Sequence, residues 1–434
     1  MAKHCSYASP SGWNAIASNC RVQGAPLQTD LKTRYLIVGA GYAGLAAARR
    51  LAELYPDETI VVVDALAPAE NSSGRNSGFM IDLPYAKIVA NASQEKSAWQ
   101  TKLLQAGKAL LEDIVQKHNI TCGWGETGHY KAATTHFGVG ELRAVERTLE
   151  QNRVPFRRLS AGQIRDELGS SHYKQAIWLK YCTLVQPAEL VNGLIASLPA
   201  NVNVFFDTPV TAVTGDSPYL VTAGGHQITA EHLLLCVNTA MPCFGHAKYK
   251  QLTLYTYAGL SRELSQSESE AFGSAAEWGI TPVERLEATS RKLGGKRFML
   301  RAGFSYKREL PAEKVRKMLV DMLLARYPQM SADLFEHVWG GAVSLTRNGD
   351  PVFERLGDKL YGLSGCNASG ILKMTMLGKL LVDSIAGVPS ALLKQTQELS
   401  RPNFIPPDPI RRIAVDLSIR KIQHQINQSE RAPS

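Results

Sequence analysis

The first regular pattern of apolar and polar positions along the chain lies between residues 35 and 64. The apolar run Tyr35–Val38 is typical of a parallel strand that is buried on both faces. Residues 46–54 are rich in alanine and leucine and predict a helix, which Pro56 ends. The run Thr59–Val63 predicts a second strand. The pattern therefore predicts a strand, a turn, a helix and a second strand in succession.

Three glycines occupy the turn before this helix, with the spacing G-x-G-x-x-G. Gly39 permits a tight turn, Gly41 lets a pyrophosphate approach the backbone, and Gly44 lets the helix pack close to the strand. The helix N-terminus favours phosphates, and the Asp64 carboxylate stands where it can accept from a ribose hydroxyl. We therefore predict dinucleotide binding, against the alternative of an alanine-rich α/β unit with tight turns. The residues assigned to this site are Gly39, Ala40, Gly41, Tyr42, Ala43, Gly44 and Asp64.

The glycine motif does not decide between NAD and FAD, since both carry an adenosine ribose. NADP is disfavoured because Ala65 and Leu66 offer no arginine to a 2′-phosphate. Residues 71–78 (NSSGRNSG) form a small, polar segment that can wrap a cofactor, with Arg75 facing a phosphate or carboxylate. A surface turn is the alternative, but the position of the segment after a dinucleotide unit favours a cofactor contact. The candidates are Ser73, Arg75, Asn76 and Ser77.

Three separated parts of the chain resemble the D-amino-acid oxidase-like family of FAD-dependent oxidoreductases. The first part is residues 39–65 with SSGRNSG, which is similar to the S-G-R-N-G-G run of the amine and amino-acid branch, where gamma-glutamylputrescine oxidase belongs. The second part runs from LVQPAELVNG to HLLLCVN, and the third from WGGAVSLTRNGDPVF to LYGLSGCNASGILK. The resemblance implies FAD as cofactor and spans roughly residues 33 to 387 in the family's order.

The resemblance also implies roles for residues that the pattern alone does not assign. Val210 would meet the adenine end of FAD through its backbone, although a plain core residue is the alternative. Gly370, Ile371, Leu372 and Lys373 would lie against the pyrimidine edge of the flavin ring, at the N-terminus of a helix. Lys373 could add a cation there, or could face solvent. The family often has a histidine where this chain has Ser369.

For the reaction, the resemblance implies that an unprotonated amine gives its α-hydrogen to flavin as hydride, and that the imine then hydrolyses. No dedicated side-chain base is required. Arg301 is a candidate clamp for a substrate carboxylate, as is Arg347, and Tyr257 could close the pocket, as could Tyr255. The catalytic candidates are thus Arg301, Tyr257 and Lys373, each with a structural role as the alternative.

The length of 434 residues favours two domains. We expect an α/β fold, with a Rossmann-like FAD-binding domain and a second, mixed-sheet substrate domain. The predicted parts are an N-terminal arm (1–32), an FAD-binding domain (33–120, 184–242 and 340–400), a substrate domain (121–183 and 243–339), and a C-terminal linker and helix (401–434).

The net charge of +9 is spread along the chain, which argues against a nucleic-acid partner. Two apolar stripes share the predicted helix at residues 410–426, so we expect it to dock on the protein or a partner, with peripheral contact to an anionic membrane as the alternative. No run of about 18 apolar residues predicts a spanning helix. Seven scattered cysteines and the lack of an apolar leader favour a cytoplasmic protein, and no zinc-type spacing predicts a metal site.

The favoured function is oxidation of a C–N bond in an amine or amino acid by an FAD-dependent oxidase or dehydrogenase, with O₂ or a quinone as electron acceptor. Two alternatives stay open from the sequence. One is an NAD-dependent dehydrogenase, which would be colourless when purified. The other is a flavin-binding subunit or scaffold that oxidises no substrate itself.

Overall fold

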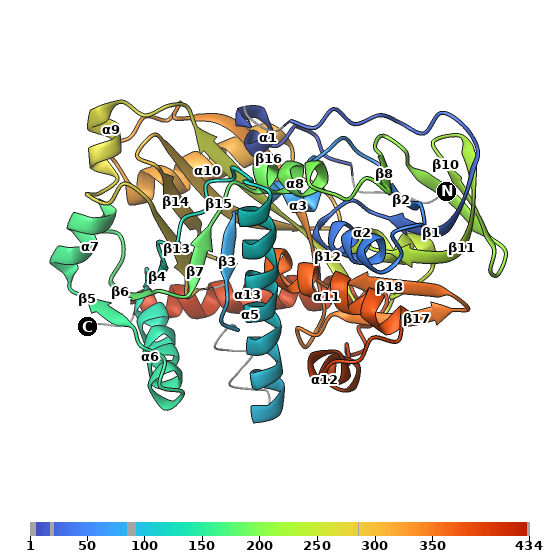
Figure 1. Cartoon of the computed structure of the whole chain (residues 1–434). Helices are drawn as coiled ribbons and strands as arrows, with labels where there is room; N and C mark the ends of the chain where they lie inside the picture. The colour runs from blue at the N-terminus through green and yellow to red at the C-terminus, as the bar shows by residue number, and fades with distance from the viewer. Residues whose placement is uncertain (1–5, 18–20, 85–92, 285, 432–434) are drawn as a thin grey trace.

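Figure 1 shows a computed structural model of the chain, which describes residues 6–17, 21–84, 93–284 and 286–431. Two eight-stranded sheets and a two-stranded ribbon, β3 (Phe79–Ile81) with β7 (Cys182–Leu184), make up its β structure. Helix α5 (Gln94–Lys117) runs across the front of the molecule where the two sheets approach each other (Figure 1). The predicted α/β fold class with a second, mixed sheet is confirmed.

The first sheet has the predicted strand–helix–strand unit at its centre. Its strands are β1 (Leu31–Val38), β2 (Ile60–Val63), β8 (Val202–Phe205), β9 (Val210–Thr214), β10 (Tyr219–Ala223), β11 (His226–Leu235), β17 (Val352–Gly357) and β18 (Leu360–Ser364). The strands β8, β2, β1, β11 and β18 are neighbours in that order and all run parallel. Residues 35–38 and all of β2 are buried, as expected for strands that are covered on both faces.

Two helices cover one side of this sheet. Helix α2 (Tyr42–Leu54) follows the glycine turn, and α11 (Gly370–Ile385) packs against it. The approach is so close that a Cβ at Gly378 would meet the Ala43 carbonyl oxygen at 2.2 Å. The apolar side chains of α2 and α11 then form one core with α5 and with α8 (Pro187–Ala196).

The second sheet is mixed. Its strands are β4 (His129–Ala133), β5 (Arg157–Leu159), β6 (Gln175–Leu179), β12 (Leu252–Ser261), β13 (Trp278–Pro282), β14 (Thr289–Leu293), β15 (Arg297–Tyr306) and β16 (Phe335–Leu345). Their order is β16-β12-β15-β14-β13-β4-β6-β5, and only β13 and β4 pair in parallel. Helix α10 (Ala312–Arg326) packs on one face, where Tyr257, Phe298 and Leu319 share a second core. The other face is available to the site described below.

The remaining helices lie at the edges of the two sheets. They are α1 (Gly12–Ile16), α3 (Ser72–Arg75), α6 (His136–Gln151), α7 (Ala161–Leu168), the 3₁₀ helix η1 (Asn238–Phe244), α9 (Gln266–Ala271), α12 (Ala391–Leu399) and α13 (Ile410–Arg431). The predicted domain boundaries stay a proposal, and the boundary at residue 340 falls inside β16.

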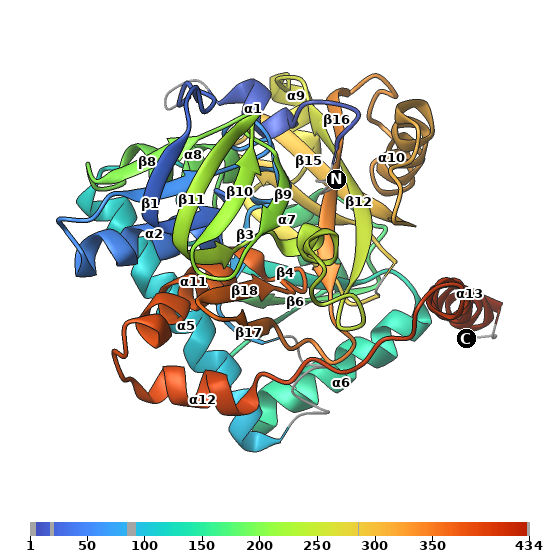
Figure 2. The ribbon, with the colours of Figure 1, turned by 90° about the vertical axis from the view of Figure 1, so that its right-hand side faces the viewer.

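The C-terminal helix α13 lies against α6 (Figure 2). Val415 and Ile419 are half-buried on its inner side, whereas Ile410, Ile413 and Leu417 are exposed on its outer side. The two stripes predicted from the sequence therefore differ in environment, and the helix docks on the protein itself. Within the described part of the chain, no helix is long and apolar enough to cross a membrane.

The contact between α2 and β1 depends on Gly44. A Cβ there would meet the Gly39 carbonyl oxygen at 1.8 Å, and backbone cannot move aside as a flexible side chain can. We expect Gly44→Ala to lower the free energy of unfolding by about 1–3 kcal/mol or more. Gly140→Ala is the control, because a Cβ at this exposed position of α6 would meet nothing within 4 Å. The control should be neutral or gain up to about 1 kcal/mol. Equal Tm values for the two variants would contradict the close contact.

Candidate functional site

A single cavity of about 1420 Å³ connects the two sheets. It begins at the glycine turn between β1 and α2, passes the segment 71–78 and the N-terminus of α11, and continues over the second sheet to α13. Cavities of this kind, which converge on a helix N-terminus at one end and an apolar wall at the other, suit an elongated ligand. The sequence-predicted residues can be placed along it in order.

The glycine turn forms the first end of the cavity. Gly39 has a φ of +106°, and a Cβ at Gly41 would meet Ser73 Oγ at 2.6 Å. No side chain caps α2, and its Tyr42 amide donates to Ser73 Oγ at 3.3 Å. Gly39, Gly41, Tyr42 and Ala43 line the cavity. Backbone amides at an uncapped helix N-terminus therefore border the space where a phosphate would lie.

Asp64 ends β2 beside this turn. Its Oδ2 accepts from the Ala40 amide at 2.8 Å, and its Oδ1 accepts from the Leu66 amide at 3.1 Å. Burial raises the pKa of the Asp64 carboxyl above its usual range, and these two hydrogen bonds oppose the shift. Because each carboxylate oxygen has a further lone pair, Asp64 keeps the capacity to accept from a hydroxyl in the cavity.

Residues 71–78 contain the one-turn helix α3, followed by a turn that the Asn76 side chain stabilises through hydrogen bonds. Ser73, Arg75, Asn76 and Ser77 all line the cavity. The Asn76 amide group donates to the Ser73 carbonyl at 2.6 Å and accepts from the Gly78 amide at 2.8 Å. These local bonds fix the shape of the segment before any ligand is considered.

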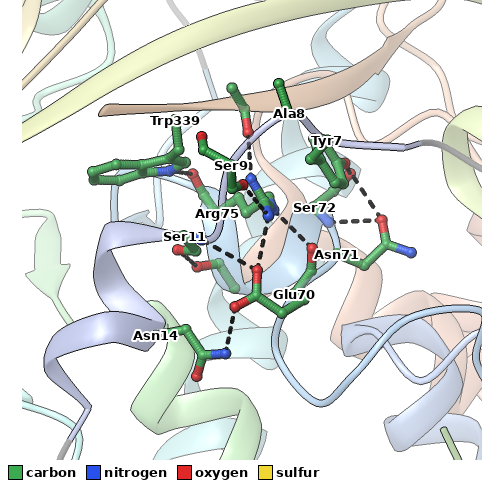
Figure 3. A network of polar contacts seen from close by, with 12 residues as sticks. Tyr7, Ala8, Ser9, Ser11, Asn14, Glu70, Asn71, Ser72, Arg75 and Trp339 are labelled. Carbon is green, nitrogen blue, oxygen red and sulfur yellow. Dashed lines mark hydrogen bonds and ion pairs between the residues drawn. The ribbon is translucent and has the colours of Figure 1, made fainter. Parts of the chain in front are cut away.

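Arg75 lies at the centre of a polar network (Figure 3). Its guanidinium donates to Glu70 Oε2 at 2.8 Å, to the Ser9 carbonyl at 2.9 Å and to the Gly340 carbonyl at 3.1 Å. The ring of Tyr7 lies 3.9 Å from the guanidinium carbon, which is a cation–π distance. The structure thus engages Arg75 with protein groups, and its contact with a phosphate or carboxylate stays a prediction.

The N-terminal arm supplies half of this network. Ser11 and Asn14 donate to the two oxygens of Glu70, at 3.1 and 2.6 Å (Figure 3). Trp13 is fully buried, packs edge-on against Trp339, and donates to the Asn76 carbonyl at 2.7 Å. The described part of the predicted N-terminal arm therefore holds residues 70–76 against β16.

The N-terminus of α11 forms the next part of the cavity wall. Gly370, Ile371 and Leu372 line the cavity, as the expected ring contacts would require. Lys373 is not among the lining residues and is only 9% exposed, so the solvent-facing alternative is wrong. Burial lowers the pKa of the Lys373 ammonium to about 8. A cationic role next to the ring stays a prediction.

Val210 begins β9 and is a buried member of the cavity wall. In the pairing of β9 with β10, Val210 lies opposite Ala223. Thr208, two residues before Val210, donates its amide to the Asp64 carbonyl at 2.8 Å. Val210 and Asp64 therefore border the same end of the cavity, and the predicted backbone contact with adenine stays a prediction.

The second sheet supplies the opposite wall. Arg301 of β15 lies directly across from Ala258 of β12, which in turn lies across from Trp339 of β16, so the three share one face. All three line the cavity. Arg301 also lies over the Phe304 ring at 5.2 Å. The candidate clamp is thus in the cavity, two strands from Trp339.

Tyr257 has its hydroxyl engaged elsewhere. The Tyr257 hydroxyl pairs with Ser305 Oγ at 2.5 Å and accepts from the Leu310 amide at 2.7 Å, within the core under α10. Burial raises the pKa of this phenol. Tyr257 still lines the cavity, and alternation along β12 places Leu254, Thr256 and Ala258 on the cavity face beside it. Thr256 Oγ1 is buried and has no hydrogen-bond partner among the described residues. The alternation of side chains along a strand is the sequence signal that could have identified Thr256 as a residue of the cavity face.

The matches to known proteins agree with this arrangement. The model of the family described as FAD dependent oxidoreductase matches residues 34–384. The chain belongs to that family. It is 22% identical over 400 residues to gamma-glutamylputrescine oxidoreductase of Escherichia coli, covering 87% of this chain and 89% of the relative. It is 21% identical to a probable oxidoreductase, OrdL, of Haemophilus influenzae, covering 81% and 82% of the two chains.

Solved structures show the same fold. Glycine oxidase from Geobacillus kaustophilus superposes with a TM-score of 0.70 at 18% identity, over 83% of this chain and 96% of the other. L-amino acid deaminase from Proteus vulgaris gives 0.66 at 13% identity, over 87% and 98%. The family match runs from residue 34 to residue 384, so the N-terminal arm precedes it and α13 follows it.

FAD is the cofactor of this oxidoreductase, and the residues present fit it. The glycine turn leaves a cradle that a Cβ would fill, and α2 has an uncapped N-terminus. Asp64 lines the cavity, and each of its carboxylate oxygens keeps a lone pair beyond its one hydrogen bond. We therefore propose as FAD contacts the predicted residues that line the cavity. Ala40, Gly44 and Lys373 were also predicted, but they are not among the lining residues. The residues kept are Gly39, Gly41, Tyr42, Ala43, Asp64, Ser73, Arg75, Asn76, Ser77, Val210, Gly370, Ile371 and Leu372.

The Glu70–Arg75 ion pair should stabilise the fold around the FAD site and thereby the binding of FAD. Arg75 has a side chain only 3% exposed, so Glu70→Ala would leave a buried cation without its carboxylate. We expect a loss of about 3–5 kcal/mol in unfolding free energy and a lower FAD-to-protein ratio after gel filtration.

Glu58→Ala is the matched control, since the Arg34–Glu58 pair has side chains 41% and 38% exposed. It should cost less than about 1 kcal/mol and leave FAD content unchanged. Equal effects of the two substitutions on stability and flavin content would refute the role of the buried pair.

Proposed function

We propose that this enzyme oxidises a C–N bond of an amine or amino acid by hydride transfer to FAD. The observation that carries the proposal is one cavity that joins the FAD end to the Arg301 face of the second sheet. The relatives support the choice of substrate class, because their names include gamma-glutamylputrescine oxidoreductase, glycine oxidase and L-amino acid deaminase.

Bound FAD supplies the hydride acceptor for this chemistry. The protein's own part is to bind and orient the substrate. In this proposal, Arg301 holds a substrate carboxylate with two parallel hydrogen bonds. The Thr256 hydroxyl, which has no hydrogen-bond partner among the described residues, bonds an amine nitrogen. Apolar side chains of Leu252, Leu254 and Leu345 line the same wall and exclude water from it. An amine that enters unprotonated needs no side-chain base.

The test is the visible spectrum of the purified holoenzyme during anaerobic addition of primary amines, secondary amines and amino acids, with matched 2-hydroxy acids alongside. We expect yellow flavin bands that are lost with at least one amine or amino acid. Loss of the bands only with hydroxy acids would overturn the C–N assignment in favour of C–O oxidation. Bands that no compound removes would instead favour a flavin-binding subunit without its own substrate.

Arg301→Gln provides the control within this experiment. If Arg301 holds a carboxylate, the substitution should raise KM about 10- to 100-fold for amino acids and leave simple amines unaffected. An equal effect on both substrate types would assign Arg301 a structural role.

The electron acceptor and the cellular location are also proposals. We propose O₂ or a quinone as acceptor, to be separated by measuring turnover with air against turnover with a soluble quinone under nitrogen. A cytoplasmic location is supported by the five described cysteines, which form no disulfide with one another. Labelled protein found only outside the cytoplasm would contradict it.

We further propose that the outer stripe of α13 binds an anionic membrane surface. Five of the six large apolar side chains that are exposed in the described chain lie on this helix or beside its start, at Tyr249, Phe404, Ile410, Ile413 and Leu417. Arg412, Arg420 and Lys421 are exposed on the same helix and carry the charge that anionic lipid attracts.

Vesicle sedimentation tests this contact. The enzyme should bind vesicles that contain phosphatidylglycerol and should not bind vesicles of phosphatidylcholine alone. The double variant Ile413→Glu/Leu417→Glu should lose binding, whereas Leu220→Glu, at the sixth exposed apolar position, should keep it. Equal behaviour of the two variants, or no binding to either vesicle, would exclude a membrane-binding role.

A further inference from the structure

The cavity face of the second sheet carries its side chains in four successive rows. The rows, which follow from strand alternation and from the pairing of β12 with β16, are Ala258 with Trp339, Thr256 with Gly341, Leu254 with Val343, and Leu252 with Leu345. Arg301 joins the first row from β15, and all of these residues line the cavity. Successive rows lie about 7 Å apart along the strands. The wall therefore changes from a cation, through a hydroxyl, to two rows that are entirely apolar.

The two apolar rows face the cavity with much of their surface. Their four aliphatic side chains are only half-buried by the described residues, although they lie inside the molecule; they are Leu252, Leu254, Val343 and Leu345. A group that covers such side chains lowers the free energy if it is apolar, because it removes apolar surface from water. The rows are therefore suited to contact with an aliphatic group.

The start of α13 lies beside the first residues of β12. Arg411 is buried and donates to three backbone carbonyls, among them that of Gln251 at 3.4 Å, next to Leu252. Val415 and Ile419 follow Arg411 at intervals of one helical turn, so they share its side of the helix. Both are half-buried and line the cavity. The helix thus adds an aliphatic wall to the part of the cavity that contains the apolar rows.

The other charged residues of the cavity do not interrupt this part. Strand β12 is one neighbour of β15, whereas β14, β13 and β4 follow on the other side. Lys131 lies on β4, three strands or about 14 Å from the strand of Arg301, and Glu284 lies just after β13. Arg347, which follows the last apolar row, is exposed. A chain of atoms that extends from Arg301 over β12 therefore runs away from both Lys131 and Glu284.

We propose that this part of the cavity binds an aliphatic side chain of the substrate, and that α13 selects its length. We name it the apolar chamber, formed by Leu252, Leu254, Val343, Leu345, Val415 and Ile419. All proposed FAD contacts lie within the family match, whereas Val415 and Ile419 lie beyond its end at residue 384, so the cofactor does not require their wall.

The substrate class is then an α-amino acid with an aliphatic side chain of several carbons. Arg301 holds the carboxylate, and the side chain lies between β12 and α13. This inference rests on the proposed function for the bond that is oxidised, but not for the binding of the carboxylate and the chain.

The first measurement varies the ligand of the wild-type holoenzyme. We measure kcat/KM for alanine, 2-aminobutyrate, norvaline and norleucine in both configurations. Straight-chain carboxylates from propanoate to hexanoate have the same carboxylate and chain without the amine, and their Kd is read from the perturbation of the flavin spectrum. Each added CH₂ should raise kcat/KM and lower the Kd about 4-fold, so norleucine should exceed alanine about 10- to 100-fold.

The second measurement varies α13. Val415→Asn/Ile419→Asn changes the inner stripe, and Ile413→Asn/Leu417→Asn is the matched control on the outer stripe, where the side chains are 54% and 58% exposed. The inner variant should lower the norleucine-to-alanine ratio about 10-fold, because an amide without a partner opposes an apolar chain. The outer variant should keep the ratio of the wild type. Val415→Phe narrows the chamber and should shift the best substrate to a shorter side chain, which loss of helix docking would not do.

A ratio that does not rise with chain length in the wild type would overturn the proposal. Equal ratios in the inner and outer variants, or an unchanged best chain length in Val415→Phe, would also overturn it. Turnover of amino acids without the chain-length trend would leave the proposed function standing and remove only the apolar chamber. Carboxylates that bind more tightly with each CH₂, in an enzyme that no amino acid reduces, would uphold the chamber and refute amine oxidation instead.

Discussion

The buried ion pair between Glu70 and Arg75 is the contact on which the site depends. Glu70 accepts from the N-terminal arm, and Arg75 donates both to that arm, at the Ser9 carbonyl, and to β16, at the Gly340 carbonyl. A buried cation and carboxylate stay together because, once separated, each would be a buried charge with neither water nor a partner to stabilise it. The pair therefore fixes three segments, distant in sequence, around the residues that border the FAD site.

The remainder of the site follows from how the two sheets are built. A parallel sheet places the ends of its strands at one edge, so the turn after β1 and Asp64 after β2 meet there. An antiparallel ladder places side chains directly across from one another, so a row of them crosses the second sheet. The cavity is the space where this edge and this row face each other.

The sequence predicted well what depends on short-range pattern. The strands around residues 35–38 and 60–63, the helix between them and the close approach at Gly44 all follow from local spacing, and the structure confirms them. The two stripes of α13 were also visible as periodicity. The family resemblance extended this to the α11 turn, which periodicity alone does not assign.

The sequence did not reveal what depends on long-range packing. Trp13 lies in a segment without periodicity, and its partners Asn76 and Trp339 are far away along the chain. Tyr257 lines the cavity, but its hydroxyl is bonded within the core under α10, and only the packing of the second sheet shows this.

The FAD site and the far side of the cavity are built from different parts of the chain. The matched segment, which ends at residue 384, contains the FAD site, whereas α13 closes the far side of the same cavity from beyond it. Apart from Arg411, the α13 residues in the cavity wall are small or aliphatic. Natural variation in these few residues can therefore reshape the end of the cavity that α13 lines while the flavin chemistry stays constant, so descendants of this protein can acquire new substrates through their C-terminal helix alone.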